Sequence, residues 1–381
     1  MLEDKNEKNK NDTLDNLTKT GRIFKGSEVL EVLERFYNYK PQVSYPKHFR
    51  VGDRKYHDLA STFVDAGAGK YRQCRAKWDD GITASTISIF NVTTEYERGK
   101  DLLQSYRYIN YNLAVDEIDW IYRKKSNNVS ELKSKIWTKW ADENGTIGKA
   151  YGYQVGKKVY DSKLSDNKID QMDYILESLI LDPDNRRMLI NLYDVDELSE
   201  MALAPCAYET YFMVDYKDYT DPQLNMILNQ RSGDFLVAAH PGGWNEFQYY
   251  VLYTLIANLT GYTKGKFVHN TYNMHIYDRH SEIIPMNTPA ANISGSLPNP
   301  FVIKDEYMKQ IFDIRKKYLP EKYINVSIAV AELPEEERKA YAREIIDLFY
   351  KYEIGEWFYI EEYTEKLKKI APEIKNIPVA E

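Results

Sequence analysis

A chain of 381 residues, 43% of them hydrophobic, is long enough to bury one large core or two smaller ones. Its formal net charge is −7 and no segment is strongly basic, which argues against DNA or RNA as the main partner. The two cysteines are far apart in sequence and form no disulfide framework, so a reducing cytoplasm is the expected location. No run of about 18 apolar residues is present to span a membrane.

The chain is predicted to have three parts. Residues 1–20 are rich in Asn, Lys and Asp, which predicts a disordered arm without the apolar run of a signal peptide. From about Ile23 to Pro334, periodic runs alternate with turn signals and no linker is evident, so residues 21–333 are predicted to be one catalytic domain. Residues 334–381 are predicted to be a helical appendix and tail.

Hydrophobic periodicity predicts both helices and strands in the main part. Apolar residues at helical spacing predict a helix over Lys168–Leu181, with Asp166 or Asn167 as its N-cap and Pro183 after its end. Glu246–Leu259 is mostly apolar and is predicted to be a buried helix. Three strands are predicted, namely Met188–Tyr193, Thr210–Val214 and one within Gln223–Val237.

The C-terminal region has a clear helix-start signal. Pro334 is followed by three glutamates, which favour the first turn of a helix. The residues after it form one apolar stripe, made of Tyr341, Ile345, Leu348, Phe349 and Tyr352. The predicted fold class is therefore α+β, with a sheet packed against helices and extra helices at the C-terminal end.

Cys206, in Ala204-Pro205-Cys206, is weak evidence alone, because a lone cysteine is usually buried and inert. Its context is more informative. The segments 182–188 (DPDNRRM), 230–234 (QRSGD) and 275–280 (HIYDRH), with Asn245 between the last two, occur in an order that resembles the thymidylate synthases and the related pyrimidine nucleotide hydroxymethylases. The resemblance covers about 120–280, reaches back weakly to Ser88, and implies a mixed sheet with helices against it.

The resemblance implies covalent catalysis by Cys206. A thiolate that adds to C6 of a uracil ring makes C5 nucleophilic, which divides one hard step into easier ones. Arg231 is similar to the arginine that contacts both the phosphate and the nucleophile, and it would lower the pKa of the thiol. The implied phosphate ligands are Arg186, Arg187, Arg231 and Ser232. Arg186 and Arg187 would reach the site of a partner subunit in a homodimer with shared active sites, although a solvated turn is the alternative for this pair.

Three further residues match positions that hold the nucleoside. Asn245 is similar to the amide that accepts from N3–H of uracil and donates to O4. The preceding loop, Val237–Trp244, is longer than usual, so an ordinary helix N-cap and a deoxycytidylate substrate remain alternatives for Asn245. His275 and Tyr277 resemble the pair that binds the sugar 3′-hydroxyl, and Tyr151 resembles the active-site tyrosine.

The implied one-carbon donor is 5,10-methylenetetrahydrofolate, and no metal is expected. Glu117 is similar to the catalytic glutamate that moves protons around O4, with a solvated surface carboxylate as the alternative. Trp137 and Trp140 match tryptophans near the folate, where a flat ring stacks on a flat pterin, with core packing as the alternative. Asp234 resembles the carboxylate that binds the pterin ring.

Four departures from ordinary synthases affect the expected product. Ala207 follows the nucleophile where synthases have His, the turn 79–82 lacks an expected phosphate-binding arginine, and Lys124 replaces a glycine. Glu381 ends a tail that is otherwise similar to the synthase tail that closes over the site. These departures favour a viral deoxyuridylate hydroxymethylase of a phage type, working in the host cytoplasm. The alternatives are a thymidylate synthase, a deoxycytidylate hydroxymethylase and a non-catalytic relative.

Overall fold

The computed structural model describes residues 72–96, 108–240, 242–281, 299–370 and 377. The arm predicted for residues 1–20 and the terminal Glu381 lie outside these ranges. No helix in the described ranges is long and apolar enough to cross a bilayer.

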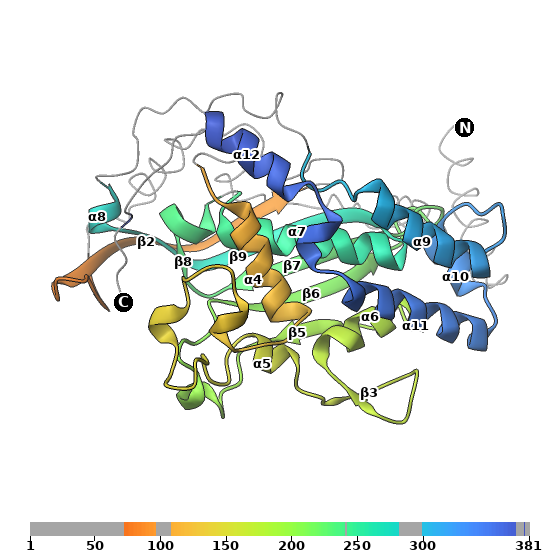
Figure 1. Ribbon diagram of the computed structural model, residues 1–381, viewed down its shortest axis with the longest axis horizontal. Helices are drawn as coiled ribbons and strands as arrows, with labels where there is room; N and C mark the ends of the chain where they lie inside the picture. Colours follow the sequence, from red (N-terminus) through yellow and green to blue (C-terminus); the bar gives the residue numbers. More distant parts are fainter. Residues whose placement is uncertain (1–71, 97–107, 241, 282–298, 371–376, 378–381) are drawn as a thin grey trace, which may run out of the picture.

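A seven-stranded sheet forms the centre of the described structure (Figure 1). Its order is β1-β2-β9-β7-β6-β5, and the short β8 pairs with β9 beside this path. The β7–β9 and β8–β9 pairs are parallel and the others are antiparallel, so the sheet is mixed, as predicted. The bounds are β1 Arg72–Lys77, β2 Thr83–Tyr96, β5 Leu189–Asn191, β6 Ala207–Asp215, β7 Gln223–Gln230, β8 Gly233–Asp234 and β9 Thr263–Tyr277.

Helices and turns make up most of the remaining described structure. The longer helices are α4 Tyr111–Tyr122, α6 Gln171–Leu181, α7 Trp244–Thr260, α9 Asp305–Tyr318, α11 Glu335–Lys351 and α12 Ile360–Ile370. The shorter ones are α5 Gly152–Val155, α8 Asp278–Ser281 and α10 Val326–Ala331. A hairpin pairs β3 Tyr160–Asp161 with β4 Lys168–Ile169, a π-helical turn spans Phe235–Ala239, and 3₁₀ turns span Val129–Glu131, Thr138–Trp140, Leu198–Glu200 and Ile354–Trp357.

The two faces of the sheet differ in the described part of the chain, where the long helix α7 packs on one of them. Along β7, buried side chains alternate strictly with half-buried ones, because successive residues of a strand point to opposite faces. The buried set packs against α7, which is apolar almost all round and lies in the middle of the core. On the other face, Asn229 donates to Glu209 and accepts from Asn270, so polar side chains bridge β6, β7 and β9.

The predicted helix over Lys168–Leu181 exists, but its predicted start is wrong. Helix α6 begins at Gln171, because the carboxylate of Asp170 accepts from the backbone N–H groups of Met172 and Asp173. Lys168 belongs to β4 instead. All three predicted strands are present, with β5 shorter and β6 longer than expected.

The C-terminal helices pack on the main part of the chain. Helix α11 begins directly after Pro334, as predicted, and buries Tyr341, Ile345, Leu348 and Phe349. Tyr352 lies just beyond the helix end and is half-buried. Helix α11 packs against α6 and α9, and its apolar side chains belong to the same core cluster as those of α4 and α7.

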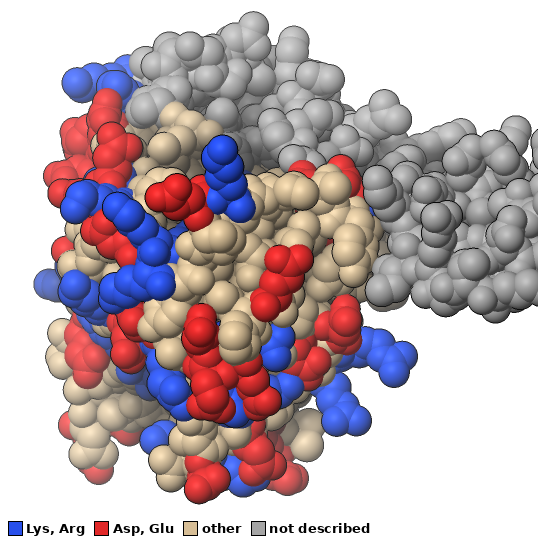
Figure 2. All heavy atoms as spheres, turned by 90° about the vertical axis from the view of Figure 1, so that its right-hand side faces the viewer, with Lys and Arg blue, Asp and Glu red and all other residues tan. Residues whose placement is uncertain are grey.

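Acidic and basic side chains are interspersed on the face shown in Figure 2. Neighbouring charges of opposite sign on helix α11 and its surroundings pair with each other, for example Lys317 with Glu344 and Lys339 with Glu335. A continuous basic stripe, of the kind that follows a phosphate backbone, is therefore not a feature of that face.

Candidate active site

Cys206 lies directly before β6 and is held beside Arg231. The backbone N–H of Arg231 donates to the carbonyl of Cys206 at 2.9 Å, which fixes the two residues on adjacent strand ends. The guanidinium donates to the carbonyls of Pro205 and Ala204 at 3.0 and 2.7 Å, and its Nη2 lies 3.8 Å from the sulfur. Burial raises the pKa of the Cys206 thiol, and the cationic Arg231 acts in the opposite direction. Formation of the thiolate therefore depends on Arg231.

Tyr151 contacts the nucleophile from a strained backbone position. Its φ of 47° is rare for a residue with a side chain, and such strain is commonest at functional sites. The hydroxyl of Tyr151 accepts from the backbone N–H of Cys206 at 3.3 Å. Gly152 follows, and a Cβ there would lie 2.1 Å from the carbonyl oxygen of Ser126, so only glycine allows the two loops to approach this closely.

Glu117 is buried on α4 and is surrounded by neutral donors. The indole N–H groups of Trp137 and Trp244 and the amide of Gln248 all donate to its carboxylate, the last two at 2.5 and 2.6 Å. Burial raises the pKa of Glu117, and the nearby carboxylate of Asp116 adds to this shift, whereas the three hydrogen bonds oppose it. A carboxyl group with a raised pKa is suited to take and return protons. Because Glu117 is buried, the alternative of a solvated surface carboxylate is wrong.

Asn245 lies between the residues around Cys206 and the residues around Glu117. It lies in the first turn of α7, whose N-cap is Gly243, so the interpretation of Asn245 as an ordinary N-cap is wrong. Its Oδ1 accepts from Gln230 at 3.3 Å, and its Nδ2 donates to Gln248 at 3.2 Å. Because Gln230 precedes Arg231 and Gln248 binds Glu117, a chain of hydrogen bonds joins the surroundings of Cys206 to the buried carboxylate.

His275 and Tyr277 lie together at the end of β9. Nδ1 of His275 lies 3.1 Å from the carbonyl of Asn273, and a carbonyl only accepts, so Nδ1 carries a proton. Burial lowers the pKa of His275, which favours the neutral ring with Nε2 as an acceptor. Tyr277 stacks edge-to-face on His275, and burial raises the pKa of Tyr277 to about 12, so its hydroxyl stays protonated.

Ser232 lies between β7 and β8, and Asp234 is the last residue of β8. Ser232 accepts from the Gln230 side chain through its carbonyl, and Asp234 pairs with His275 in the β8–β9 register. One carboxylate oxygen of Asp234 caps the following π-helical turn through Leu236, and the other lies 3.4 Å from Nδ1 of His280. Asp234 is therefore fixed in place by its own loop.

The two predicted folate tryptophans differ in their surroundings. Trp137 is buried, donates to Glu117 and packs edge-to-face on Tyr151 at 5.0 Å between ring centroids. Trp140 is half-buried and lies 5.5 Å from Trp137. Of the two, Trp140 has the more accessible ring for stacking, and Trp137 mainly shapes the environment of Glu117.

Arg186 and Arg187 do not join the cluster of Cys206 within one chain. Both are exposed on the turn between α6 and β5, where the side chain of Asn185 accepts from the backbone of Arg187. Their contribution to phosphate binding stays a prediction, as does the homodimer on which it depends.

The departures from the family pattern have local partners. Asp80, in the turn between β1 and β2, pairs with Arg279 at 2.7 Å, and this hydrogen bond lowers the pKa of Asp80. Nζ of Lys124 lies 3.8 Å from a carboxylate oxygen of Asp119 and 3.8 Å from one of Glu353. Ala207 is buried at the start of β6.

Sequence reasoning missed several residues of the site. Trp244 and Gln248 hold Glu117, and Gln230 holds Asn245. Their positions gave usable signals, because Gln230 directly precedes Arg231 and Gln248 is three residues after Asn245, on the same side of a helix.

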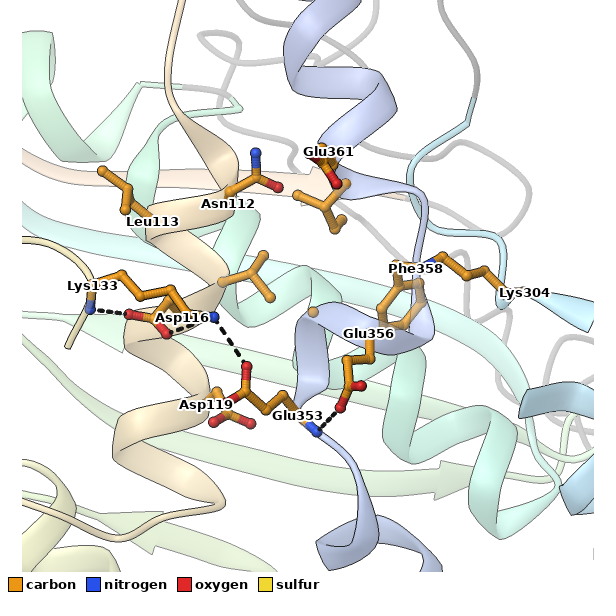
Figure 3. Close-up of a pocket in the computed structure, with 13 residues that line it drawn as sticks. Asn112, Leu113, Asp116, Asp119, Lys133, Lys304, Glu353, Glu356, Phe358 and Glu361 are labelled. Carbon is orange, nitrogen blue, oxygen red and sulfur yellow. Dashed lines mark hydrogen bonds and ion pairs between the residues drawn. The ribbon is translucent and has the colours of Figure 1, made fainter. Parts of the chain in front are cut away.

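A pocket of about 420 Å³ lies beside α4, between this helix and the segment that follows α11 (Figure 3). Asp116 accepts from the backbone of Lys133 at 2.7 Å, and the ammonium of Lys133 pairs with Glu353 at 3.0 Å. Asp119 accepts from the backbone of Ile354 at 2.9 Å. The C-terminal region therefore braces the helix that carries Glu117.

Comparison with known proteins identifies the class. The sequence profile described as Thymidylate synthase matches residues 54–329, so the chain belongs to the thymidylate synthase family. It is an enzyme of a family of one-carbon transferases that act on deoxyuridylate with 5,10-methylenetetrahydrofolate as the donor.

Individual relatives are similar over most of their length. Thymidylate synthase 1 of Bacillus spizizenii is 36% identical over 233 residues, which covers 60% of this chain and 80% of that protein. The thymidylate synthase of Bacillus phage phi3T is 35% identical with the same coverage. The structure of thermostable thymidylate synthase A from Bacillus subtilis superposes with a TM-score of 0.54 at 33% identity, over 61% of this chain and 83% of that one.

These similarities confirm the predicted fold class and one-carbon donor. They do not carry the preference for a hydroxymethylase, because these relatives are named thymidylate synthases. That preference rests on the substituted positions alone.

Proposed function

We propose that this protein is a thymidylate synthase, which converts deoxyuridylate to thymidylate and releases dihydrofolate. The observation that carries the proposal is the chain of hydrogen bonds from Gln230 through Asn245 to the buried Glu117. Gln230 directly precedes Arg231, whose guanidinium lies beside the sulfur of Cys206. The names of the similar proteins support the methylated product over the hydroxymethylated one.

Cys206 begins the reaction as a thiolate. Its sulfur forms a bond to C6 of the uracil ring, and the electron pair of the C5–C6 double bond moves towards C5 and O4. Arg231, 3.8 Å from the sulfur, stabilises the thiolate and is placed to bind the phosphate together with Ser232. Loss of Arg231 would therefore affect both nucleotide affinity and the rate of the first step.

Glu117 acts on the carbonyl side of the ring. Burial raises its pKa, which suits it to exchange a proton with O4 as negative charge develops there. Trp137, Trp244 and Gln248 keep the carboxyl group in one position through both protonation states. This arrangement orients the group before the reaction begins, which lowers the cost of reorganisation.

The remaining nucleotide contacts follow from the geometry of each side chain. Asn245 offers Oδ1 to N3–H and Nδ2 to O4 of uracil. Nε2 of His275 accepts from the sugar 3′-hydroxyl, and the protonated hydroxyl of Tyr277 adds a donor beside it.

We expect Arg186 and Arg187 to complete the phosphate site of a second subunit. Their exposure leaves both guanidinium groups accessible to another chain. The sheet face that carries the exposed side chains of Met213 and Tyr272 is a suitable surface for that contact. A homodimer with two shared active sites follows from this proposal.

The residues near Glu117 fit a folate. The half-buried ring of Trp140 offers a flat surface for a pterin, and the fixed carboxylate of Asp234 offers acceptors for ring N–H groups. When bound, 5,10-methylenetetrahydrofolate supplies the carbon unit and the hydride of the methyl group. The packed rings of Trp137 and Tyr151 lie beside Glu117 and Cys206, where they are suited to limit the access of water.

Deoxyuridylate 5-hydroxymethylation is the second candidate, favoured by Ala207. A small apolar side chain beside the nucleophile leaves room for water, which would add in place of hydride. Against this, Ile377 of the C-terminal tail packs on the apolar cluster that contains Phe235 and Met274, near the strand end that carries His275. An apolar residue packed at this strand end is suited to limit the access of water, which favours hydride transfer.

The two products are distinguished by one experiment. Purified protein is mixed with deoxyuridylate and 5,10-methylenetetrahydrofolate, near-ultraviolet absorbance follows dihydrofolate, and mass spectrometry identifies the nucleotide. Stoichiometric dihydrofolate with a methylated nucleotide is the expected result. A hydroxymethylated nucleotide without dihydrofolate would overturn the proposal and establish the second candidate.

A further inference from the structure

Behind the site lies a second buried carboxylate, Glu246, paired with an imidazole. Glu246 on α7 and His269 on β9 are 0% and 1% exposed, and Oε1 of Glu246 lies 3.3 Å from Nδ1 of His269. The other carboxylate oxygen accepts from the hydroxyl of Tyr96 at 2.7 Å and from the backbone of Gly242 at 2.6 Å. Nε2 of His269 lies 2.9 Å from Oε1 of Gln230, so the pair leads directly to the residue that holds Asn245.

The partners of Gln230 determine which ring nitrogen of His269 carries a proton. Nε2 of Gln230 lies 2.9 Å from the carbonyl of Ser232, and a carbonyl only accepts, so the amide nitrogen must face that way. The amide oxygen of Gln230 therefore faces His269, whose Nε2 must donate. Nδ1 of His269 faces the carboxylate of Glu246 at 3.3 Å, and Nε2 also lies 3.2 Å from the hydroxyl of Thr271. The pair thus presents a fixed donor to Gln230.

This donor sets the direction of the whole chain of amides. With its oxygen bound by His269, Gln230 turns its nitrogen towards Oδ1 of Asn245. At the other end, Nε2 of Gln248 donates to the carbonyl of Ala114 and to Glu117, so its oxygen faces Nδ2 of Asn245. Asn245 is consequently held from both sides with Oδ1 and Nδ2 in defined places. A reversed amide would face a donor with a donor and an acceptor with an acceptor.

We propose that Glu246 and His269 are positioning residues for base selection: acting through Gln230, they hold the amide of Asn245 in the orientation that fits uracil and excludes cytosine. The inference rests on the proposed nucleotide substrate. Uracil offers a donor at N3 and an acceptor at O4, whereas cytosine offers the reverse, so the orientation of one amide decides between them. Neither Glu246 nor His269 touches the base in this arrangement.

The test is the ratio of the dissociation constants for deoxyuridylate and deoxycytidylate, measured by calorimetry on the full chain. His269→Phe keeps a flat ring but removes the donor, so the oxygen of Gln230 loses a partner and the amide can rotate. We expect the preference of the variant for deoxyuridylate to fall by about tenfold, since an unmet buried hydrogen bond typically has an effect of that size. An unchanged ratio in a folded variant would overturn the inference.

Two matched variants separate positioning from stability. Tyr253→Phe removes another buried hydrogen bond of α7, the one to the carbonyl of Leu224, and should lower the melting temperature without changing the ratio. Glu246→Gln should keep most of the discrimination, because an amide donating to Nδ1 leaves the proton of His269 on Nε2. Loss of discrimination in Tyr253→Phe to the same extent as in His269→Phe would indicate a general packing effect and count against the inference.

A spectroscopic measurement covers the case in which His269→Phe does not fold. Nitrogen NMR of wild-type protein with labelled histidine should show Nε2 of His269 protonated, and an unprotonated Nε2 would refute the inference. Failure of the proposed nucleotide substrate, on which the inference rests, is distinguishable, because wild-type protein would then bind neither nucleotide. Wild-type preference for deoxycytidylate would instead contradict the deduced orientation of Asn245.

Discussion

Glu117 and Glu246 are both buried carboxylates at opposite ends of one chain of hydrogen bonds, yet their surroundings differ. Glu117 receives only neutral donors, from two indoles and one amide, and lies near another carboxylate. Glu246 faces an imidazole that can share a proton with it. The comparison teaches that burial alone does not assign a role. A carboxyl group with neutral donors is suited to exchange a proton, whereas one paired with a histidine is suited to hold a fixed arrangement.

The largest effect should come from removal of the nucleophile Cys206, which takes part in the reaction itself, as Glu117 does and Glu246 does not. Cys206→Ala should abolish turnover, because Cys206 carries the sulfur that forms the bond to C6. Deoxyuridylate should still bind, as measured by calorimetry. Cys74→Ala is the matched control and should retain activity, since Cys74 lies on β1, which β2 separates from β9, and its thiol donates to the carbonyl of Ala84. Substantial turnover by Cys206→Ala would remove this residue from the mechanism.

The comparison itself is tested by making the same substitution at both carboxylates. Glu117→Gln should lower kcat by about 10²- to 10⁴-fold, the usual range for loss of a general acid–base group. Glu246→Gln should change kcat little, because the amide preserves the shape of the network. Steady-state rates at saturating substrate provide the measurement. Equal losses in the two variants would show that the distinction between the two carboxylates is wrong.

The difference in stability between Glu117→Gln and wild type should also depend on pH in a defined direction. Burial raises the pKa of Glu117 above its ordinary value of 4.5, so the folded protein binds this proton more tightly than the unfolded chain. The stabilising contribution is complete below pH 4.5 and is lost as pH rises to the folded pKa. Thermal unfolding should therefore show the variant gaining stability relative to wild type as pH rises through this window. A constant difference would argue against the raised pKa.

A smaller effect should come from the exposed Arg186 and Arg187, which we expect to act in the active site of a second subunit. Arg187→Ala mixed with Cys206→Ala should recover activity, because a hybrid dimer contains one site with both native residues. Random exchange makes about half of the dimers hybrid, so about a quarter of wild-type activity is expected. Activity after mixing, with subunit exchange confirmed by mass spectrometry, is the measurement. No recovery despite exchange would place the arginines outside the phosphate site.

The sequence predicted the residues that take part in the reaction better than the positioning pair Glu246 and His269, for physical reasons. Cys206 and Arg231 belong to short motifs, and the apolar run of α7 is visible from periodicity alone. Glu246 and His269 are 23 residues apart and meet only because β9 lies in parallel beside β7 and α7 packs on both. No local pattern reveals such a pair.

Local competition explains the misplaced helix start. The stretch before α6 contains several residues able to cap a helix, and propensity does not rank them. Asp170 prevails because its carboxylate also binds Lys125, whose position depends on the loop after α4. Tertiary contacts therefore decided which of several suitable side chains became the cap.

The smallest predicted effect concerns the brace between the C-terminal region and α4. Lys133 donates to Glu353, and this hydrogen bond lowers the pKa of Glu353 below its ordinary value. The contribution of the pair is present above that ordinary value and is lost as pH falls through the lowered pKa. Because Glu353 is 41% and Lys133 65% exposed, solvent screens the pair, and Glu353→Gln should cost less than about 1 kcal/mol of unfolding free energy.

The effect of Glu353→Gln on activity should also be small. Asp119 is buried and accepts from the backbone of Ile354, so it keeps the C-terminal region on α4 and should limit any change in kcat to about twofold. Lys366→Gln, which removes an exposed pair within α12, is the control for a pair that does not touch α4. A tenfold loss of kcat in Glu353→Gln, with the control unchanged, would show that the brace governs the position of Glu117 and that the two buried carboxylates are not the main determinants of activity.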